Sequence, residues 1–478
     1  MTGDKGGKYT EKILAKNRCF TSHAPDFCCI VGNILYWMKS GAGQVPQIIR
    51  KISVLPLAAV IFFTVSGGPY GLEPLVGYAG GYAIPLLMIT PLLWDIPMIL
   101  VVLELNSMMP VEGGYYEWVK RGLGTQWAFM EGCWTWLYSF VDLAIYPVLF
   151  VEYAAFFFPQ IVVYKIPLCL VMIWLVAALN IRGIVIIGKT AILLTVALMI
   201  PFVFLYFAGL LHPAFHATHA NNGMTSLGMA LFTIMWNWIG WDNATTYAGE
   251  VQRPVRSYLT AIILAFSTIY LFYLSFIFLA LHSGISESEF AEKGIPYLGT
   301  MIGGHSLGGI LSMGGMASML GIFCAVMLSV SRIPAVMGKD KVLPEFFTRY
   351  HRKYSTPHVS IIVCACIVSI LVLRPLADLF IMDICLYTAG ISLEFIALIK
   401  LRRKESDTAR PFRIPVQKKG LILLFMAPVL VFSVALGNTL IGSKENQLAV
   451  LFAGAAILAA PVIWFLMQKL KIKTGRHY

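Results

Sequence analysis

The chain has 478 residues, of which 58% are hydrophobic and only 13% are charged. A soluble protein of this length needs far more polar surface, so the composition excludes a soluble fold and indicates a polytopic membrane protein. The formal net charge of +12 requires no nucleic-acid partner, because the basic residues gather in the loops predicted to face the cytoplasm.

Apolar runs predict twelve membrane-spanning helices. A bilayer core of about 30 Å is crossed by a helix of about 20 apolar residues. Runs of this kind occur at about 52–78, 81–108, 125–156, 161–180, 184–211, 224–250, 257–282, 305–336, 358–373, 376–401, 420–441 and 447–468. Residues 1–49 show no signal-peptide pattern and are predicted to be a loosely ordered cytoplasmic region. Within it, Cys28 and Cys29 are either a lipidation site or, as we favour, an unremarkable pair.

The basic residues predict the orientation of the chain. If the N-terminus is cytoplasmic, only four of the 36 Lys and Arg residues lie in outer loops, namely Lys165, Lys293, Arg374 and Lys444. Lys and Arg accumulate on the cytoplasmic side of membrane proteins. Both termini, including the short tail 471–478, are therefore predicted to be cytoplasmic, in a plasma membrane or a bacterial inner membrane.

The first predicted span is interrupted by the stretch TVSGGPYGLE. Unpaired backbone groups cost several kcal/mol in hydrocarbon, so an irregular backbone persists only where protein or a water-filled cavity satisfies it. The carbonyl groups of Ser66 and Gly67 are therefore predicted to accept hydrogen bonds from a substrate ammonium group. Pro69 suits the first turn of a helix, and a half-helix beginning there would attract a substrate carboxylate to its N–H groups. Glu73 lies just beyond the break.

The sixth predicted span repeats this interruption in the stretch LFTIMWNWIGWDNATTYAGEV. Gly240 lies between tryptophans, and the carbonyl groups around it are candidates for an ammonium group. Trp236, Trp238 and Trp241 cluster at this break, where a ring face covers an ammonium group or closes the site. Asp242 follows the break and caps the second half-helix, binds the substrate, or does both.

The two interruptions lie five spans apart. An odd offset orients the two halves in opposite directions across the bilayer, which is typical of an inverted repeat that binds its substrate at the midplane between broken helices. The first repeat covers residues 50–211, the second covers 224–404, and residues 405–470 hold the last two spans. Close helix packing is the alternative use of the glycines, but a Gly-Gly-Pro run within one span favours a site.

Carboxylates within the spans are the other candidates, because an acid in the membrane is costly and marks a functional site by default. Asp142 lies deep in the third span, and Glu394 in the tenth either carries a proton or pairs with Lys400. Glu104 and Glu250 lie near inner ends of spans and are expected to be structural or gating residues. The remaining acids are Asp95, Glu152, Asp378 and Asp383, and the one deep base is Lys189. This excess of acid fits cationic substrates or protons.

The sequence contains no pattern for catalysis or for a cofactor. His212, His216 and His219 have the spacing of metal ligands, but no acidic or cysteine partner follows, so they are predicted to lie in a solvated loop. The nine cysteines are scattered, mostly within spans, as small apolar residues are. We therefore expect no enzyme activity, no metal site and no cofactor.

Five stretches in order carry a family resemblance: VSGGPYGLE, ELNSMMPVEGGYYEWV, FVDLAIYPVLF, WDNATTYAGEV and LEFIALIKLRRKESDTARPFRIP. With the inner loop GKDKVLPEFFTRYHRKYSTPHVS, they make residues 50–470 resemble the amino acid–polyamine–organocation (APC) superfamily, and most closely its plant-type polyamine uptake and L-type amino acid transporters. The resemblance implies an all-α integral membrane fold of twelve transmembrane helices. Ten of them form a five-plus-five inverted repeat (LeuT-like) with helices 1 and 6 broken, and two are added.

The resemblance also implies a substrate site built from Ser66–Gly68 and residues 236–242. Trp236 stands where related carriers of arginine and agmatine place an occluding aromatic residue, and Asp242 stands where they place a glutamate. Leu198 occupies the position at which several proton-coupled members carry a lysine, so coupling must use acids. The acids available for it are Asp242, Asp142 and Glu394.

These observations predict a secondary active transporter that imports cationic polyamines or basic amino acids by alternating access, with proton symport. A diamine needs two anionic partners, whereas an amino acid needs a carboxylate acceptor at the first break. The sequence offers Asp242 as one anion and Glu73, Asp142 or Glu394 as the second. The alternative is a neutral or general amino acid permease or exchanger. A nutrient sensor that binds without transport is disfavoured, because the C-terminal tail is short and residues 1–49 contain no recognisable module.

Overall fold

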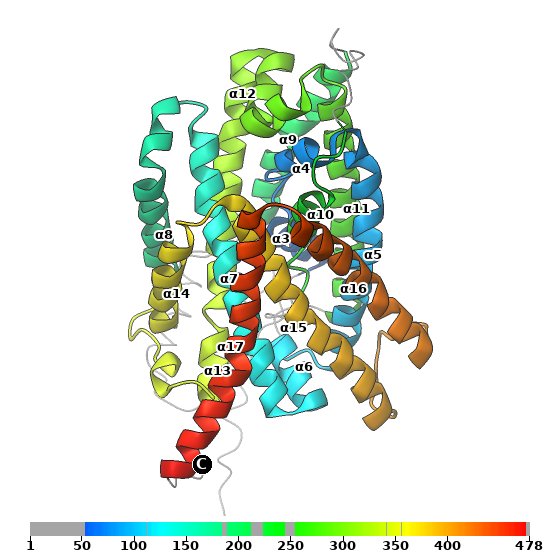
Figure 1. Ribbon diagram of the computed structural model, residues 1–478, viewed down its shortest axis with the longest axis vertical. Coiled ribbons are helices and arrows are strands. Elements are labelled where there is room, and N and C mark those ends of the chain that lie inside the picture. Colours follow the sequence, from blue (N-terminus) through cyan, green and yellow to red (C-terminus); the bar gives the residue numbers. More distant parts are fainter. Residues whose placement is uncertain are drawn as a thin grey trace, which may run out of the picture. The chain divides into compact units, whose positions relative to one another are not determined.

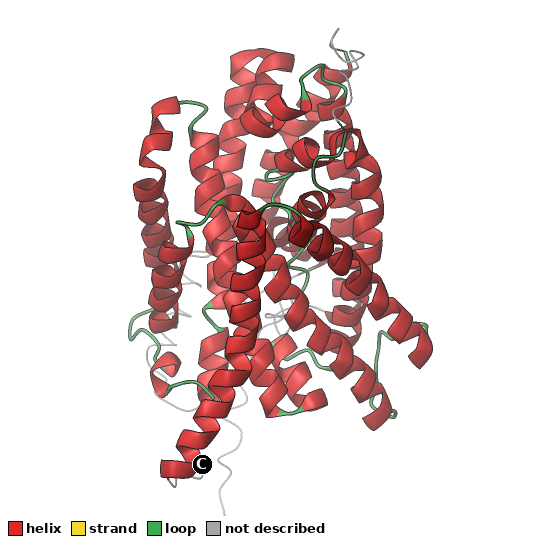
Figure 2. Cartoon of the chain, in the orientation of Figure 1, coloured by secondary structure: helices red, strands yellow, loops and turns green. Residues whose placement is uncertain are grey.

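The computed structural model describes residues 53–111, 113–183, 189–211, 223–243, 254–340, 342–354 and 356–474. Within these ranges all regular structure is helical (Figures 1 and 2). The helices are α3 (Val54–Val65), α4 (Glu73–Ala79), η2 (Gly80–Tyr82), α5 (Ala83–Met108), α6 (Gly114–Leu123), α7 (Thr125–Ala154), η3 (Pro159–Tyr164), α8 (Lys165–Ile181), α9 (Lys189–Leu210), α10 (Leu227–Trp236), α11 (Pro254–Leu281), α12 (Glu287–Val330), α13 (Ile333–Lys339), η6 (Glu345–Thr348), α14 (His358–Leu371), α15 (Leu376–Lys404), α16 (Lys418–Ile441) and α17 (Lys444–Thr474).

Eight helical segments of the described chain are long and apolar enough to cross a membrane, and four shorter apolar helices accompany them. The eight are Glu73–Met108, Thr125–Ala154, Pro159–Ile181, Val255–Leu281, Glu287–Val330, Leu376–Lys404, Lys419–Ile441 and Lys444–Met467. The four are Val54–Val65, Thr195–Leu210, Leu227–Trp236 and His358–Leu371. Each of the twelve predicted ranges contains one of these apolar helices or overlaps it, and the count of twelve spans stays a prediction.

The first predicted span consists of α3 and α4 with an irregular segment between them. Gly67, Gly68 and Gly71 adopt φ values of 60°, 111° and 90°, which glycine adopts without the clash that a Cβ atom causes. The half-helix α4 begins at Glu73, so the prediction that it begins after Pro69 was wrong. The positive φ of Gly71 accounts for the difference, because a right-handed helix cannot include it.

The sixth predicted span is interrupted as well. Helix α10 begins after Ser226, whose side chain accepts a hydrogen bond from the Met229 N–H group at 3.3 Å, and ends at Trp236. Gly240 follows with a φ of 98°, and a Cβ atom there would lie 3.1 Å from the carbonyl oxygen of Thr64. Glycine thus lets the second break approach the first. The predicted second half-helix of this span lies outside the described residues.

The helices α7 and α15 form the centre of the helix packing around these breaks. Helix α7 makes its most extensive contacts with α15 and α12. Helix α3 packs mainly on α11, and α10 packs on α16 and α4. Exposed apolar side chains such as Leu423, Leu430 and Leu451 cover α16 and α17, as expected of helices that face lipid.

Two helices lie where the sequence predicted loops. Helix α6 (Gly114–Leu123) is amphipathic and short, so no apolar run indicates it in the sequence. Helix α12 extends from Glu287, although the predicted eighth span begins at residue 305. Non-helical backbone at Gly303 and Gly304 separates its first part from the span. In Figure 1, α6, α13 and the end of α17 lie at one end of the helices, and the first part of α12 lies at the other.

Candidate functional site

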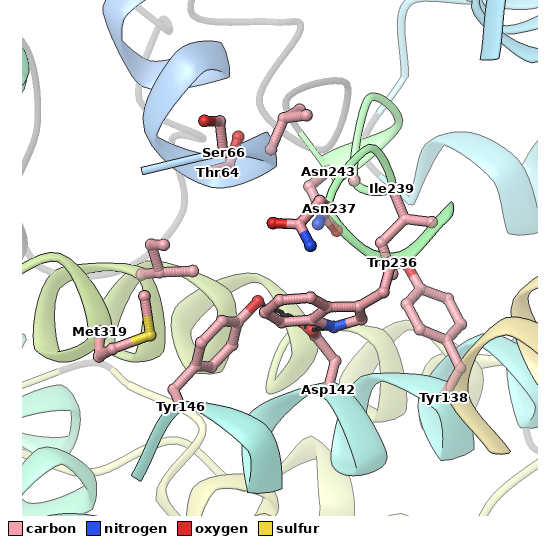
Figure 3. A pocket seen from close by; sticks show the side chains of 13 residues that line it. Thr64, Ser66, Tyr138, Asp142, Tyr146, Trp236, Asn237, Ile239, Asn243 and Met319 are labelled. Atoms are coloured by element: carbon pink, nitrogen blue, oxygen red, sulfur yellow. Dashed lines mark hydrogen bonds between the residues drawn. The ribbon is translucent and has the colours of Figure 1, made fainter. Parts of the chain in front are cut away.

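A cavity of about 20 Å³ lies between the two breaks, α7 and α12 (Figure 3). It is lined by Thr64, Val65, Ser66, Tyr138, Asp142, Tyr146, Trp236, Asn237, Ile239, Gly240, Asn243, Met319 and Ile322. Four predicted site residues are among them: Ser66, Asp142, Trp236 and Gly240. A space of this size holds a water molecule but no organic substrate, so the site is closed in this structure.

Asp142 supplies the carboxylate of this cavity. The hydroxyl group of Tyr146, one helical turn away, lies 2.8 and 2.7 Å from its two oxygen atoms. The indole N–H group of Trp236 donates a hydrogen bond to the same carboxylate at 3.1 Å. The Trp236 ring also stacks on Phe380 of α15, with ring centroids 4.7 Å apart. Trp236 thus joins the second break to α7 and α15 and closes one side of the cavity (Figure 3).

Side chains from α11 and α12 satisfy the irregular backbone of the first break. The carbonyl group of Gly67 accepts a hydrogen bond from Ser318 at 2.6 Å. The hydroxyl group of Tyr273 lies 2.7 Å from the Ser66 hydroxyl and 3.2 Å from the Gly68 carbonyl oxygen. The Gly67 and Gly68 carbonyl groups therefore already have donors within the protein, and the Ser66 side chain is the part of this break that lines the cavity.

Glu73 lies on a second cavity, of about 440 Å³, together with Glu152 and Lys293. Its carboxylate accepts hydrogen bonds from the backbone N–H group of Gly71 at 2.7 Å and from the Tyr153 hydroxyl at 2.8 Å. The end of α4 that was expected to receive a substrate carboxylate thus carries a carboxylate of the protein itself.

The ring of Trp236 lies next to Gly71, which precedes this end of α4. A Cβ atom added at Gly71 would be only 2.6 Å from that ring. The side chain of Leu149, which lines the 440 Å³ cavity, lies next to the same glycine. Trp236 therefore stands between the larger cavity and the closed one.

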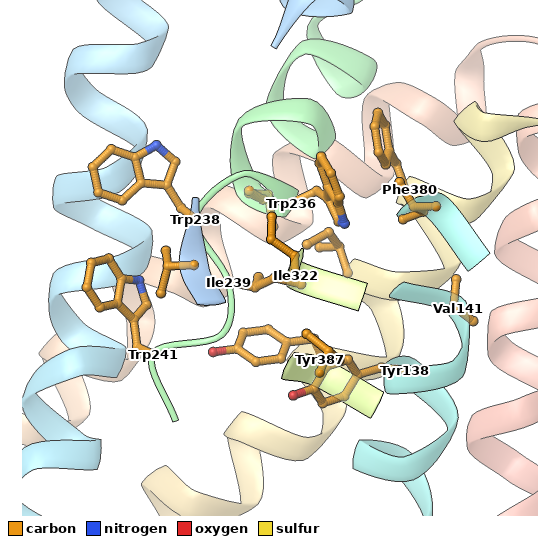
Figure 4. Packing of buried hydrophobic residues seen from close by; sticks show 14 of the residues in the cluster. Tyr138, Val141, Trp236, Trp238, Ile239, Trp241, Ile322, Phe380 and Tyr387 are labelled. Atoms are coloured by element: carbon orange, nitrogen blue, oxygen red, sulfur yellow. The ribbon is translucent and has the colours of Figure 1, made fainter. Parts of the chain in front are cut away.

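Trp238 and Trp241 lie away from the closed cavity (Figure 4). Both are fully buried, and each packs against Phe266 of α11, with ring centroids 5.0 and 5.9 Å apart. The ring of Trp238 also packs edge-on against Tyr273. The structure therefore places these two tryptophans where they pack the second break against α11, and Trp236 alone of the three lines the cavity.

Asp242, Glu131 and Glu394 form a second group of buried carboxylates, which we call the inner acids. Their side chains come from the second break, α7 and α15. The charge on Asp242 acts on Glu131 and on Glu394, and that on Glu131 acts on Glu394. Glu131 accepts a hydrogen bond from Thr135 at 2.8 Å. Lys400, which the sequence offered as a partner of Glu394, is exposed, and no ion pair joins the two in the described structure.

Glu104 has the structural role expected of it. Its carboxylate lies 2.7 Å from Nε of Arg402 and accepts a hydrogen bond from the Ile414 N–H group at 2.9 Å. Arg410 approaches it to 3.6 Å. The expectation that Lys189 is the one deep base was wrong, because Arg402 is buried against Glu104. This role of Arg402 could not be predicted from the sequence, because the residue is one of several basic residues at the end of α15.

Of the other acids in the predicted spans, Asp95 and Asp383 are fully buried. Glu152 pairs with Lys165 and Asp378 with Arg374, each at 2.8 Å. Within the described residues, no group of three His, Cys, Asp or Glu side chains could hold a metal ion. Lying outside the described structure are Cys28, Cys29, Glu250, the side chain of Lys189, and the loop histidines His212, His216 and His219.

Several residues of the site were not predicted from the sequence. Tyr138 and Tyr146 lie four residues before and after Asp142, a spacing that places all three on one face of α7. That spacing is a signal in the sequence that identifies them. Tyr273 and Ser318 have no such signal, because they meet the first break only through the packing of α11 and α12.

The chain is similar to known proteins over most of its length. The model of the amino acid permease family matches residues 52–463. A probable polyamine transporter of Arabidopsis thaliana is 35% identical over 399 residues, which cover 80% of this chain and 82% of that protein. The Arabidopsis polyamine transporter RMV1 is 32% identical over 442 residues, covering 90% and 89% of the two chains. The polyamine transporter PUT1 of Oryza sativa subsp. japonica is 31% identical over 435 residues, covering 89% and 81%.

The family match covers most of the chain, including both breaks, α7 and α15. The resemblance noted in the sequence is thereby confirmed. Together with the apolar helices, the match identifies an integral, multi-pass membrane protein whose activity is transport and not enzymatic catalysis. The chain belongs to the amino acid permease family.

Proposed function

We propose that the protein is a secondary active transporter that imports organic cations, either polyamines or basic amino acids. The observation that carries this proposal is the Asp142 carboxylate in the closed cavity between the two breaks, whose described lining contains no Lys or Arg. A cation is the ligand that such a carboxylate binds with a charge-assisted hydrogen bond. The names of three relatives as polyamine transporters support the same substrate class.

The carboxylate of Glu73 favours amines over amino acids within that class. An amino acid brings its own carboxylate, which needs unpaired N–H groups at a broken helix. At the first break, Glu73 already accepts the hydrogen bond of the Gly71 N–H group, and it repels a second anion. A diamine or polyamine has no such group, so the Glu73 carboxylate attracts it.

The transport cycle that we propose is alternating access within a five-plus-five inverted repeat of a twelve-span protein. The 440 Å³ cavity receives the substrate first. Rotation of the Trp236 side chain away from Asp142 then admits the substrate to the closed cavity. Because α6, α13 and the end of α17 gather at one end of the helices (Figure 1) and lie in or next to the basic segments of the sequence, we assign that end, and both termini, to the cytoplasm.

Proton symport is the coupling that we propose. Asp142, Asp242 and Glu394 are buried carboxylates, and acids buried within the membrane form the proton relays of pumps and transporters. Leu198 of α9 is buried and apolar, so the α9 position that carries a lysine in several related carriers supplies no charge here. The acids are therefore the groups that carry the coupled proton.

Uptake into proteoliposomes tests this function. We expect inward movement of radiolabelled putrescine, spermidine and arginine that increases with an inward proton gradient, and little movement of leucine. Asp142→Asn should abolish the uptake, because it removes the buried negative charge that binds the cation. Asp378→Asn, which removes an acid that pairs with Arg374 at the end of α15, is the matched control and should retain uptake.

Two other results of these experiments would indicate a different function. Leucine exchange that needs only counter-substrate and survives Asp142→Asn would identify a neutral amino acid exchanger. Saturable binding of putrescine without any uptake, measured on the same protein, would identify a sensor built on a transporter fold.

A further inference from the structure

Helices α7 and α15 carry the same three residue types on their facing sides, in opposite order. Along α7 the order is Glu131, Tyr138, Asp142, and along α15 it is Asp383, Tyr387, Glu394. The intervals are seven and four residues on α7 and four and seven on α15. Each interval returns a side chain to the same face of a helix. The two helices pack closely and run antiparallel. Residues of the same type on the two helices therefore lie opposite each other at three levels.

Contacts between the helices support this matched register. The rings of Tyr138 and Tyr387 pack edge to face, with centroids 5.2 Å apart, and Figure 4 shows them side by side. The charge on Asp142 acts on Asp383, and that on Glu131 acts on Glu394. Four residues from Glu394, a Cβ atom at Gly390 would lie 3.2 Å from the Glu131 carboxylate. We call Asp142 and Asp383 the upper pair and Glu131 and Glu394 the inner pair.

The inner pair is buried, and one oxygen atom of each of its carboxylates has no hydrogen-bond partner. Glu131 is 1% exposed and Glu394 is 2% exposed, and Oε2 of each has no hydrogen-bond partner. Within the described residues, no Lys or Arg side chain forms an ion pair with either pair of acids. Two like carboxylates side by side in a dry site do not both remain charged unless a cation joins them.

A tyrosine hydroxyl group between the pairs also lacks a partner. Tyr138 lines the closed cavity and is 3% exposed, yet its hydroxyl group makes no hydrogen bond. It lies within electrostatic range of both Asp142 and Asp242. A buried hydroxyl group without a partner is costly, and Tyr138 lies between Glu131 and Asp142 along α7. This group is therefore available to a ligand that extends past it.

The spacing of the two pairs selects a length of ligand. Eleven residues separate Glu131 from Asp142 on α7, and eleven separate Asp383 from Glu394 on α15. At a rise of 1.5 Å per residue, the two levels are about 16 Å apart along the helices. A four-carbon diamine is too short to reach both levels at once, whereas an extended tetraamine such as spermine reaches both.

We propose that Glu131 and Glu394 form a second ammonium subsite, which binds the far end of a long polyamine whose near end is held at Asp142. Tyr138 and Tyr387 line the stem of the ligand between the two subsites, with their hydroxyl groups available to its inner nitrogen atoms. This inference rests on the proposed function and specifies it: the protein selects elongated polyamines over short diamines.

A series of diamines tests the subsite on the wild-type protein. Straight-chain α,ω-diamines, from diaminobutane to diaminododecane, compete with radiolabelled putrescine for uptake into proteoliposomes. Monoamines of the same length are the matched controls, because they contribute the same methylene groups without the second charge. We expect each long diamine that bridges the two pairs to bind about tenfold or more tightly than its monoamine control. We expect no such added gain for diamines of intermediate length.

A substitution in the inner pair tests whether the added affinity for long diamines arises there. Glu131→Gln should remove the extra affinity for long diamines and leave the affinity for putrescine unchanged. Asp378→Asn, on the same helix as Glu394 but at its other end, should change neither. If no diamine binds more tightly than its monoamine control, or if Glu131→Gln weakens the binding of putrescine and of long diamines equally, the subsite does not exist.

The failure of this inference is distinguishable from failure of the proposed function. Putrescine uptake that depends on Asp142 but shows no length effect overturns the second subsite alone. Absence of any uptake of putrescine by the wild-type protein overturns both proposals.

Discussion

At the scale of single residues, we propose that the placement of negative charge around the two breaks decides which substrates fit. Asp142 places a carboxylate in the closed cavity, held by Tyr146 and by the indole of Trp236. Glu73 places another at the start of α4, where it accepts hydrogen bonds from Gly71 and Tyr153. An ammonium group is attracted by both carboxylates. A substrate carboxylate is repelled by the one at the helix end that would otherwise bind it.

The Glu73 carboxylate can be tested with two substrates that differ by one group. Agmatine is arginine without its carboxylate, so the ratio of their transport efficiencies reports the effect of Glu73 on that group alone. We expect the wild-type protein to prefer agmatine. Glu73→Gln should raise the arginine-to-agmatine ratio of kcat/KM about tenfold or more, because opposed like charges cost several kcal/mol.

Glu152→Gln is the control for that experiment, because it removes a carboxylate from the same 440 Å³ cavity but not from the end of α4. The ratio should stay at its wild-type value in this variant. If Glu73→Gln leaves the ratio unchanged, or if both variants raise it equally, then Glu73 does not select against the substrate carboxylate.

At the scale of helices, two ion pairs of different kinds fix the end of α15. Arg402 and Glu104 join it to α5 in the protein interior, with side chains 4% and 0% exposed. Arg121 and Glu405 join it to α6 at the surface, with atoms 3.1 and 2.7 Å apart. A buried pair that loses one partner leaves an uncompensated charge, whereas an exposed pair contributes little.

Breaking the buried pair should therefore destabilise the protein strongly. We expect Glu104→Gln to lower the free energy of unfolding by about 3–5 kcal/mol, with a matching drop in the thermal unfolding midpoint of the detergent-solubilised protein. Glu405→Gln at neutral pH is the comparison, and it should lower the midpoint far less. Equal effects of the two substitutions would contradict the structural role assigned to Glu104.

The surface pair predicts a dependence on pH. The hydrogen bonds from the Arg121 guanidinium hold the pKa of the Glu405 carboxyl below its ordinary value. A lowered pKa in the folded state stabilises the protein above the unfolded-state pKa, and this stabilisation is lost as the pH falls through the folded-state pKa. Wild-type stability, measured as the thermal midpoint, should therefore fall with acidification slightly more steeply than that of Glu405→Gln. Parallel curves would show that the pair contributes nothing.

At the scale of the whole molecule, the parts that follow local rules could be predicted from the sequence. The spans appear as apolar runs, and the breaks appear because Gly67, Gly68 and Gly240 are unusual inside such runs. The depth of Asp142 also follows from its place within a span. These signals identified four residues of the closed cavity, and the five stretches that resemble the APC superfamily indicated the family.

Features that depend on packing between distant segments could not be predicted. The sequence does not show that Trp236 turns toward Asp142 while Trp238 and Trp241 turn toward α11, because all three belong to one aromatic cluster. It also does not show that α7 faces α15. The mirrored order of Glu131, Tyr138 and Asp142 against the acids and tyrosine of α15 is written in the sequence, but it acquires meaning only when the two helices are known to pack together.

The central claim is that the substrate crosses this acid-lined site as a cation, and its voltage dependence tests that claim most directly. A membrane potential changes the energy of a translocated charge by about 2.3 kcal/mol per 100 mV. The measurement is the initial rate of radiolabelled putrescine uptake into proteoliposomes over a range of imposed potassium diffusion potentials, with the pH equal on both sides. We expect the rate to rise steeply as the interior becomes negative, and Asp142→Asn to abolish the response. An uptake rate that does not change with the membrane potential would contradict the claim, and so would a voltage dependence that persists in Asp142→Asn.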